Sequence, residues 1–155
     1  YTRIGSDNSI FIGSHIAHDC QVGNHTTFFN HATLAGHCEI NDHAVLSAFC
    51  TMHQFCRVGQ YAFLARGAGS PKDIAPYMLV NSEPLRPCGL NLVALKRAGF
   101  SSSLILQLKR AYRVLCRQHL TLPDALIKLK AMTQETPEIQ CIVDFFENST
   151  RGVVR

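Results

Sequence analysis

Side chains that could do acid–base chemistry gather in one part of the sequence. Seven of the eight histidines lie between His15 and His53, and one of them, His18, is followed directly by Asp19. A histidine that is held and tuned by a neighbouring carboxylate can act as a general base. Taken alone the pair has little weight, because an exposed surface histidine is at least as common.

A six-residue repeat indicates which other residues could join this pair. Large apolar residues recur every six positions, and a small residue follows each of them four positions later. The large residues are Ile4, Ile10, Ile16, Val22, Phe28, Leu34, Ile40, Leu46, Met52, Val58 and Leu64. The small residues are Asn8, Ser14, Cys20, Thr26, Ala32, Cys38, Ala44, Cys50, Cys56, Ala62 and Ala68.

This period fits neither an α-helix nor an ordinary strand. It is typical of a parallel β-helix, in which each hexad is a short strand plus a turn and three hexads make one coil. We therefore predict nearly four coils over residues 1–72, with residues 18 apart stacked at the spacing of neighbouring strands, ~4.8 Å.

Counting in steps of 18 turns the local pair into a predicted site. His18 should stack on Gly36 and then on Gln54, Asp19 should lie beside His37, and His53 flanks Gln54. One column of the coil would thus combine a base with a glycine whose bare backbone N–H could face an oxyanion. Core packing requires none of these residues.

The other histidines and the cysteines have simpler explanations. His25, His31, His37 and His43 share one hexad position in the turns, and we assign the stacked pair His25 and His43 to structure or surface. Cys20, Cys38 and Cys56 occupy the same small inner position, where a free cysteine behaves as a small hydrophobic residue. No Cys-x-x-Cys pair is present to suggest zinc.

The second half of the chain has the period of α-helices. We expect a proline-rich connecting loop over residues 73–90 and a helical domain over residues 91–155. Its predicted helices are a short one from Gly89 to Ala98 closed by Gly99, one capped by Ser101, one from about Leu122, and one capped by Thr136 with Pro137 in its first turn.

Positive charge is concentrated in the helical half. Residues 1–90 carry five Lys/Arg against six Asp/Glu, and residues 91–155 carry ten against five. Lys109, Arg113 and Arg117 should line one side of the long helix, with Arg110 beside them. Such a stripe could hold phosphates, an acidic protein or nucleic acid, although a solvated helix face is the more common outcome.

Length and hydropathy narrow the class of protein. A chain of 155 residues with 46% hydrophobic content suits one folded core with an appendage. It contains no 18-residue apolar run and no secretory leader, so we expect a cytoplasmic location and no stable membrane insertion. Because the chain starts at Tyr1 and the repeat is in phase by Ile4, we expect a fragment of a longer protein.

Several short segments are distinctive beyond the repeat. They are Ile-Gly-Ser-Asp-Asn (4–8), His-Ile-Ala-His-Asp-Cys (15–20), Ala-Thr-Leu-Ala-Gly-His (32–37), His-Gln-Phe-Cys (53–56), Gly-Leu-Asn (89–91), Leu-Lys-Arg (95–97) and the closing Phe-Phe-x-x-Ser-Thr-Arg-Gly. These segments resemble the UDP-N-acetylglucosamine O-acyltransferase family, and the similarity runs through all 155 residues. The resemblance implies a left-handed coil and a homotrimer whose active sites lie between subunits.

The resemblance also implies an activity. A 3-hydroxyacyl chain would move from acyl carrier protein to the 3-hydroxyl of UDP-N-acetylglucosamine, the first step of lipid A biosynthesis, without cofactor, metal or covalent enzyme intermediate.

The resemblance further implies roles for single residues. His18 would be the general base, Asp19 would orient it, and the N–H of Gly36 would stabilise the oxyanion. The remaining implied contacts are His15, His37, His53 and Gln54 near the sugar, phosphates or thioester, and Asn91 and Arg97 on the nucleotide or carrier side. Lys96, Arg97 and the basic stripe would dock the acidic carrier, and no nucleic acid is implied.

Three positions depart from the family pattern. Val93 stands where the family usually has a glutamate, Ala98 where it often has an arginine, and Ala65-Arg66 where long-chain members have a Gly-Gly pair. We expect Arg66 to shorten or redirect the acyl groove.

Three alternative functions remain open at this point. The N-acyltransferase of the same pathway would use the same base, but the Leu-Lys-Arg segment and the tail fit it poorly. A β-helix carbonic anhydrase would need zinc-ligand histidines at a spacing that this chain lacks. A non-catalytic trimeric scaffold that binds acyl carrier protein is disfavoured by the His18 and Asp19 pair and mildly favoured by Val93.

Overall fold

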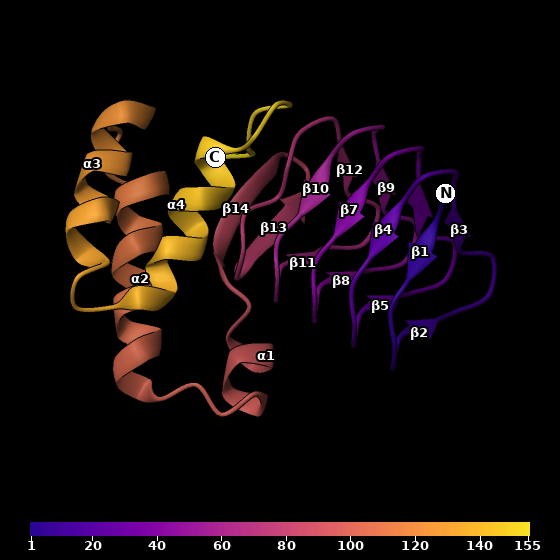
Figure 1. Ribbon diagram of the computed structural model, residues 1–155, viewed down its shortest axis with the longest axis horizontal. Helices are drawn as coiled ribbons and strands as arrows, with labels where there is room; N and C mark the ends of the chain where they lie inside the picture. The colour runs from indigo at the N-terminus through magenta and orange to yellow at the C-terminus, as the bar shows by residue number, and fades with distance from the viewer.

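Short parallel strands wind around a common axis through the first part of the chain. The computed structural model describes residues 1–155, and Figure 1 shows the coils stacked along the long axis of the molecule, with helices at one end. The strands are β1 (Arg3–Ile4), β2 (Ser9–Ile10), β3 (His15–Ile16), β4 (Gln21–Val22), β5 (Thr27–Phe28), β6 (Thr33–Leu34), β7 (Glu39–Ile40), β8 (Val45–Leu46), β9 (Thr51–Met52), β10 (Arg57–Val58), β11 (Phe63–Leu64) and β12 (Gly69–Ser70).

The strands form three sheets that are the three sides of the coil. Sheet A has the order β1-β4-β7-β10, sheet C has the order β12-β9-β6-β3, and sheet B contains β2, β5, β8 and β11. Pairing is parallel and joins residues 18 apart, as in Ile4 with Val22 and Val22 with Ile40. The predicted fold class, a left-handed parallel β-helix followed by α-helices, is confirmed.

The interior follows the repeat. From Val22 onward every large residue of the series is buried, and Cys20, Cys38 and Cys56 are fully buried, which confirms the core ladder. Burial raises the pKa of Cys38 to about 12, so its thiol stays neutral at physiological pH. Ile4 and Ile10 of the first coil are 45% and 44% exposed, because no coil of this chain covers their outer side.

Each turn places one residue in the left-handed backbone region, and the histidines of the shared hexad position occupy it. His25, His31, His37 and His43 have φ values of 56°, 60°, 60° and 61°. Asparagine, aspartate and histidine tolerate this region better than most other residues. The rings stack from coil to coil, with His25 4.9 Å from His43 and His43 4.5 Å from Tyr61 between ring centroids.

The expectation of a connecting loop over residues 73–90 is wrong. This segment contains β13 (Met78–Ser82) and β14 (Leu85–Leu90), an antiparallel hairpin whose first strand pairs in parallel with β11 and so extends sheet B. The prolines that suggested a loop are compatible with the hairpin, because Pro84 lies between its strands and Pro87 lies on the outermost strand, where no further strand needs its N–H.

The helices follow the predicted order. They are α1 (Leu92–Arg97), α2 (Ser102–Cys116), α3 (Leu122–Met132), the 3-10 turn η1 (Pro137–Ile139) and α4 (Gln140–Glu147). Ser101 caps α2 by accepting from the N–H of Leu104, whereas Thr136 makes no side-chain cap. The first helix starts later than predicted because Gly89 and Leu90 belong to β14.

The helices are arranged in two places. In Figure 1, α1 lies beside the coils, apart from α2, α3 and α4, which cluster beyond β14. None of them combines the length and the apolar character needed to cross a bilayer.

Stability should depend on the stacked interior residues. Leu46 is fully buried and pairs in register with Phe28 and Leu64, so Leu46→Ala should lower the free energy of unfolding by ~2–5 kcal/mol. Leu106→Ala is the matched control, because Leu106 is 49% exposed on α2. Urea denaturation would measure both variants, and equal losses would contradict this account of the core.

Candidate active site

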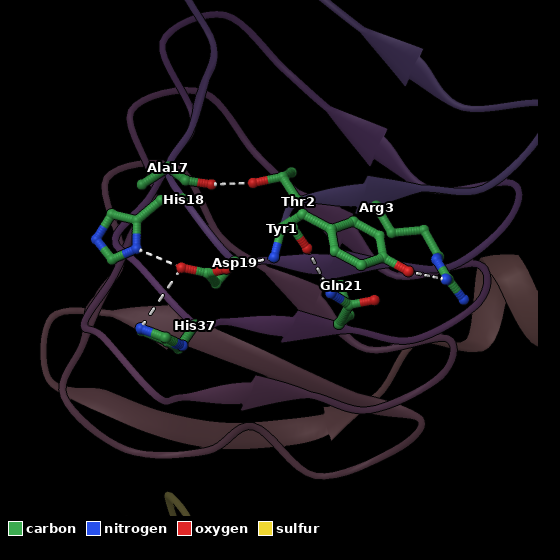
Figure 2. A network of polar contacts seen from close by, with 8 residues as sticks. All are labelled: Tyr1, Thr2, Arg3, Ala17, His18, Asp19, Gln21 and His37. Atoms are coloured by element: carbon green, nitrogen blue, oxygen red, sulfur yellow. Dashed lines mark hydrogen bonds and ion pairs between the residues drawn. The ribbon is translucent and has the colours of Figure 1, made fainter.

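Two stacked turns bring a histidine, a carboxylate and a second histidine together (Figure 2). His18 Nδ1 lies 2.9 Å from Asp19 Oδ2, and His37 Nε2 lies 3.9 Å from the same oxygen. The rings of His18 and His37 meet edge to face, with centroids 5.1 Å apart. His18 and Asp19 follow β3, and His37 follows β6 on the next coil, so the cluster lies at the corner between sheets C and A.

The backbone fixes these side chains. Asp19 and His37 both have φ near +60°, and the N–H of His37 donates to the carbonyl of His18 at 3.0 Å. The His37 ring stacks on Phe55 of the following coil, with centroids 4.7 Å apart. His37 is therefore held from both sides, whereas the His18 side chain is 73% exposed to solvent.

Gly36 leaves room for the His18 ring. A Cβ at Gly36 would lie 2.6 Å from Cε1 and 2.7 Å from Nε2 of His18, closer than side chains can approach. Its N–H donates no hydrogen bond within the chain. The N–H groups of His18 and Gln54 at the same turn position are also free, so the missing side chain is what makes the donor of Gly36 accessible beside the imidazole.

Electrostatics fix the tautomer of His18. A free carboxyl is already ionised at neutral pH, and the hydrogen bond from the His18 ring lowers the pKa of Asp19 further, so its carboxylate is charged across the physiological range. A charged carboxylate only accepts, so Nδ1 of His18 carries the hydrogen that Asp19 receives. The lone pair on Nε2 is then available to take a proton.

The other residues of the predicted site lie around this cluster. Gln54 occupies the next coil of the same column, exposed to solvent. His53 flanks this column, with its Nδ1 3.3 Å from the carbonyl oxygen of Gln54. His15 lies on β3, exposed on the outer face of sheet C, where it pairs in register with Thr33.

Arg151, which the sequence did not single out, contacts this site from the far end of the chain. Its Nη2 lies 3.1 Å from His53 Nδ1 and 3.3 Å from the carbonyl of Pro71. A guanidinium only donates, so His53 Nδ1 accepts and cannot also donate to Gln54. The tail is pinned here because the N–H of Asp73 donates to Gly152 at 2.8 Å and the N–H of Val154 donates to Asp73 at 2.9 Å.

The structure places Asn91 and Arg97 at a different corner. They line a groove of about 840 Å³ between α1 and the outer face of sheet B. The remaining wall is mainly apolar, with Val45 and Phe63 from the sheet. Asn91 is buried and caps α1, and its Nδ2 donates to the carbonyl of Tyr61 at 3.0 Å.

The column of His25, His43 and Tyr61, which lines this groove, marks the corner between sheets A and B. Arg66 lies at the third corner, between sheets B and C, with Cζ 5.6 Å from the centre of the Phe49 ring. The His18 cluster, the groove and Arg66 thus occupy three different corners of one chain.

The basic stripe on α2 faces solvent. Lys109, Arg110, Arg113 and Arg117 are all exposed, and Arg117 lies over the Tyr112 ring, with Cζ 5.8 Å from its centre.

Arg151 should set the tautomer of His53. In Arg151→Met the donor to Nδ1 is lost, so His53 should shift from the form protonated on Nε2 toward the form that donates from Nδ1 to the carbonyl of Gln54. Imidazole nitrogen chemical shifts measured by NMR would report this change. Arg155→Met is the control, because Arg155 bonds only the carbonyls of Leu115 and Leu120; an equal change in both variants would contradict the assignment.

Comparisons with known proteins show the family of the chain. The family model described as UDP-N-acetylglucosamine O-acyltransferase, domain 2, matches residues 73–154. The acyl-(acyl-carrier-protein)–UDP-N-acetylglucosamine O-acyltransferases of Halorhodospira halophila and Syntrophobacter fumaroxidans are 46% and 47% identical to the chain, which covers 60% of each.

Solved structures match as well. The UDP-N-acetylglucosamine acyltransferase of Francisella novicida has a TM-score of 0.95 at 39% identity, over 98% of this chain and 56% of that one. LpxA of Acinetobacter baumannii has a TM-score of 0.94 at 35% identity, over 98% of this chain and 59% of that one. The chain spans about 60% of the length of the curated relatives it matches, and it belongs to the UDP-N-acetylglucosamine O-acyltransferase family.

Proposed function

We propose that this chain carries the catalytic base of an acyltransferase that moves a 3-hydroxyacyl group from acyl carrier protein to the 3-hydroxyl of UDP-N-acetylglucosamine, the first step of lipid A biosynthesis. The observation that carries the proposal is the exposed His18 imidazole, bonded to Asp19 and lying against the bare backbone of Gly36. The relatives that bear this name support the choice of substrates.

The chemistry follows from these three residues. Nε2 of His18 removes the proton of the sugar hydroxyl as its oxygen attacks the thioester carbonyl carbon. The carbonyl oxygen becomes an oxyanion, and the N–H of Gly36 donates to it. Collapse of this intermediate breaks the carbon–sulfur bond, and the imidazolium returns its proton to the departing thiolate. Asp19 stays charged throughout and stabilises the imidazolium.

Contacts of the substrate beyond the reacting atoms are proposed for the surrounding residues. His37, His53, Gln54 and His15 surround the base and offer donors and acceptors to the sugar, the phosphates or the thioester. At the groove, the guanidinium of Arg97 suits a phosphate.

The active assembly is proposed to be a homotrimer in the cytoplasm. The base and the groove lie at different corners of the coil, so a ligand that needs both is best served by two copies. A rotationally symmetric contact between unlike faces closes into a ring, and the apolar groove wall of one copy would then lie beside the His18 corner of the next. Acyl carrier protein is acidic, and the exposed stripe of Lys109, Arg113 and Arg117 with Lys96 and Arg97 gives it a docking surface of opposite charge.

Removal of the base should abolish most activity. His18→Ala in the full-length protein should lower the rate of transfer from 3-hydroxyacyl carrier protein to UDP-N-acetylglucosamine by ~100-fold or more. His31→Ala is the control, because its exposed ring stacks on Phe49 at a different corner. Unchanged activity in His18→Ala would refute the role of His18, and an inactive parent protein would favour the carrier-binding scaffold.

A site shared between subunits should recover when two damaged subunits are mixed. Arg97→Ala should itself lower the rate by removing a charged hydrogen bond worth ~1.5–3 kcal/mol. In trimers assembled from equal amounts of His18→Ala and Arg97→Ala, about half of the subunits carry an intact His18 and about half an intact Arg97. A shared site takes one residue from each of two neighbouring subunits, so about a quarter of the sites would hold both intact residues. Activity should rise toward that fraction after unfolding and refolding the mixture, and activity no higher than the average of the two variants would argue against sharing.

A further inference from the structure

The cluster at the His18 corner has the composition of a metal site. His18, Asp19 and His37 each direct one ligand atom at the others, and all three atoms lie within 4.8 Å of one another. Two imidazoles and one carboxylate are a common ligand set for Zn²⁺ and its neighbours among the transition metals.

Side-chain movements of about 1–2 Å would bring the three ligand atoms, now within 4.8 Å of one another, to the spacing that a bound ion requires. Zinc bonds of ~2.0–2.2 Å in a tetrahedron place neighbouring ligand atoms ~3.3 Å apart. The His18–Asp19 pair, at 2.9 Å, would open slightly, and the His37–Asp19 pair, at 3.9 Å, would close by less than 1 Å. Asp19 offers the same oxygen, Oδ2, to both histidines.

The backbone supplies the rigidity that a metal site needs. Asp19 and His37 are in fixed left-handed turns, and Phe55 backs the His37 ring. The third ligand, His18, is the most accessible one, since its side chain is 73% exposed. Three protein ligands leave a fourth position open to water, as in sites where zinc exchanges its outer ligand.

We propose that Zn²⁺, or a divalent ion of the same class, binds His18, Asp19 and His37 and switches the acyltransferase off. The inhibitory part rests on the proposed function, and the binding part does not. Whichever nitrogen of His18 holds the metal, the base is lost: coordination by Nε2 uses the lone pair itself, and coordination by Nδ1 leaves the neutral ring with its proton on Nε2. Mg²⁺ and Ca²⁺ prefer oxygen ligands and should bind poorly.

Metal binding can be measured without any acyl transfer. Untagged full-length protein, freed of metal, would be titrated with Zn²⁺ by calorimetry and with Co²⁺ by its ligand-field absorption. We expect one ion per chain, and a loss of affinity of at least about 10–100-fold in His37→Ala and Asp19→Asn, the cost of losing even an outer-shell partner, because the first removes a ligand and the second replaces a charged ligand with a neutral one. His31→Ala should bind like the parent, and Mg²⁺ should give no heat. Absence of binding, or equal binding in all the variants, would overturn the proposal.

The acyl-transfer assay then tests inhibition by the metal separately from metal binding. Zn²⁺ should inhibit the parent protein at the concentrations at which it binds, and EDTA should restore the activity. Binding without inhibition of an active enzyme would overturn the switch. Binding to a protein that transfers no acyl group would leave the metal site standing and refute the proposed function.

Discussion

The register between coils is the constraint on which the rest of the molecule depends. Each strand hydrogen-bonds to the strand of the next coil, and the register joins residues 18 apart through all three sheets. A shift of one residue would turn the apolar series outward. The same register places His18 against Gly36 and Asp19 against His37. The core and the candidate site are thus set by one ladder, and neither can be realigned without the other.

The turns between the strands follow the same register and bring polar side chains together in columns. A left-handed residue is required once in every hexad, and side chains at that position point outward in columns. Aspartate and histidine tolerate the conformation, so the residues that suit the turn are also those that can hold and transfer protons. At one corner the column stacks histidine on tyrosine. At another corner it brings a carboxylate beside two imidazoles.

The features that the six-residue repeat determines were predicted from the sequence, and the features that lie outside the repeat were missed. The buried cysteines and the stacking of His18 on Gly36 follow from counting in steps of 18. The hairpin after the coils was missed because its prolines, at a turn and on an outer strand, have the composition of a loop. Arg151 was missed because it meets His53 across 98 residues of sequence. Its only signal is the closing motif that contains it, and no periodicity links that motif to the coils.

The His18 cluster and the groove beside α1 lie at different corners of the coil, and this separation has a physical consequence for any activity that needs both. A prism of short strands is rigid, so the groove beside α1 cannot swing toward the His18 corner of its own chain. The His18 side chain, 73% exposed in one copy of the chain, also stays solvated there. A second copy packed against that corner would supply the groove and remove solvent in one step. The local dielectric constant would then fall, so each hydrogen-bond donor or charge would act more strongly on the reacting atoms. Under the proposed function, assembly would be a condition for catalysis, because the coil alone aligns His18 with Asp19 and Gly36 but does not enclose it.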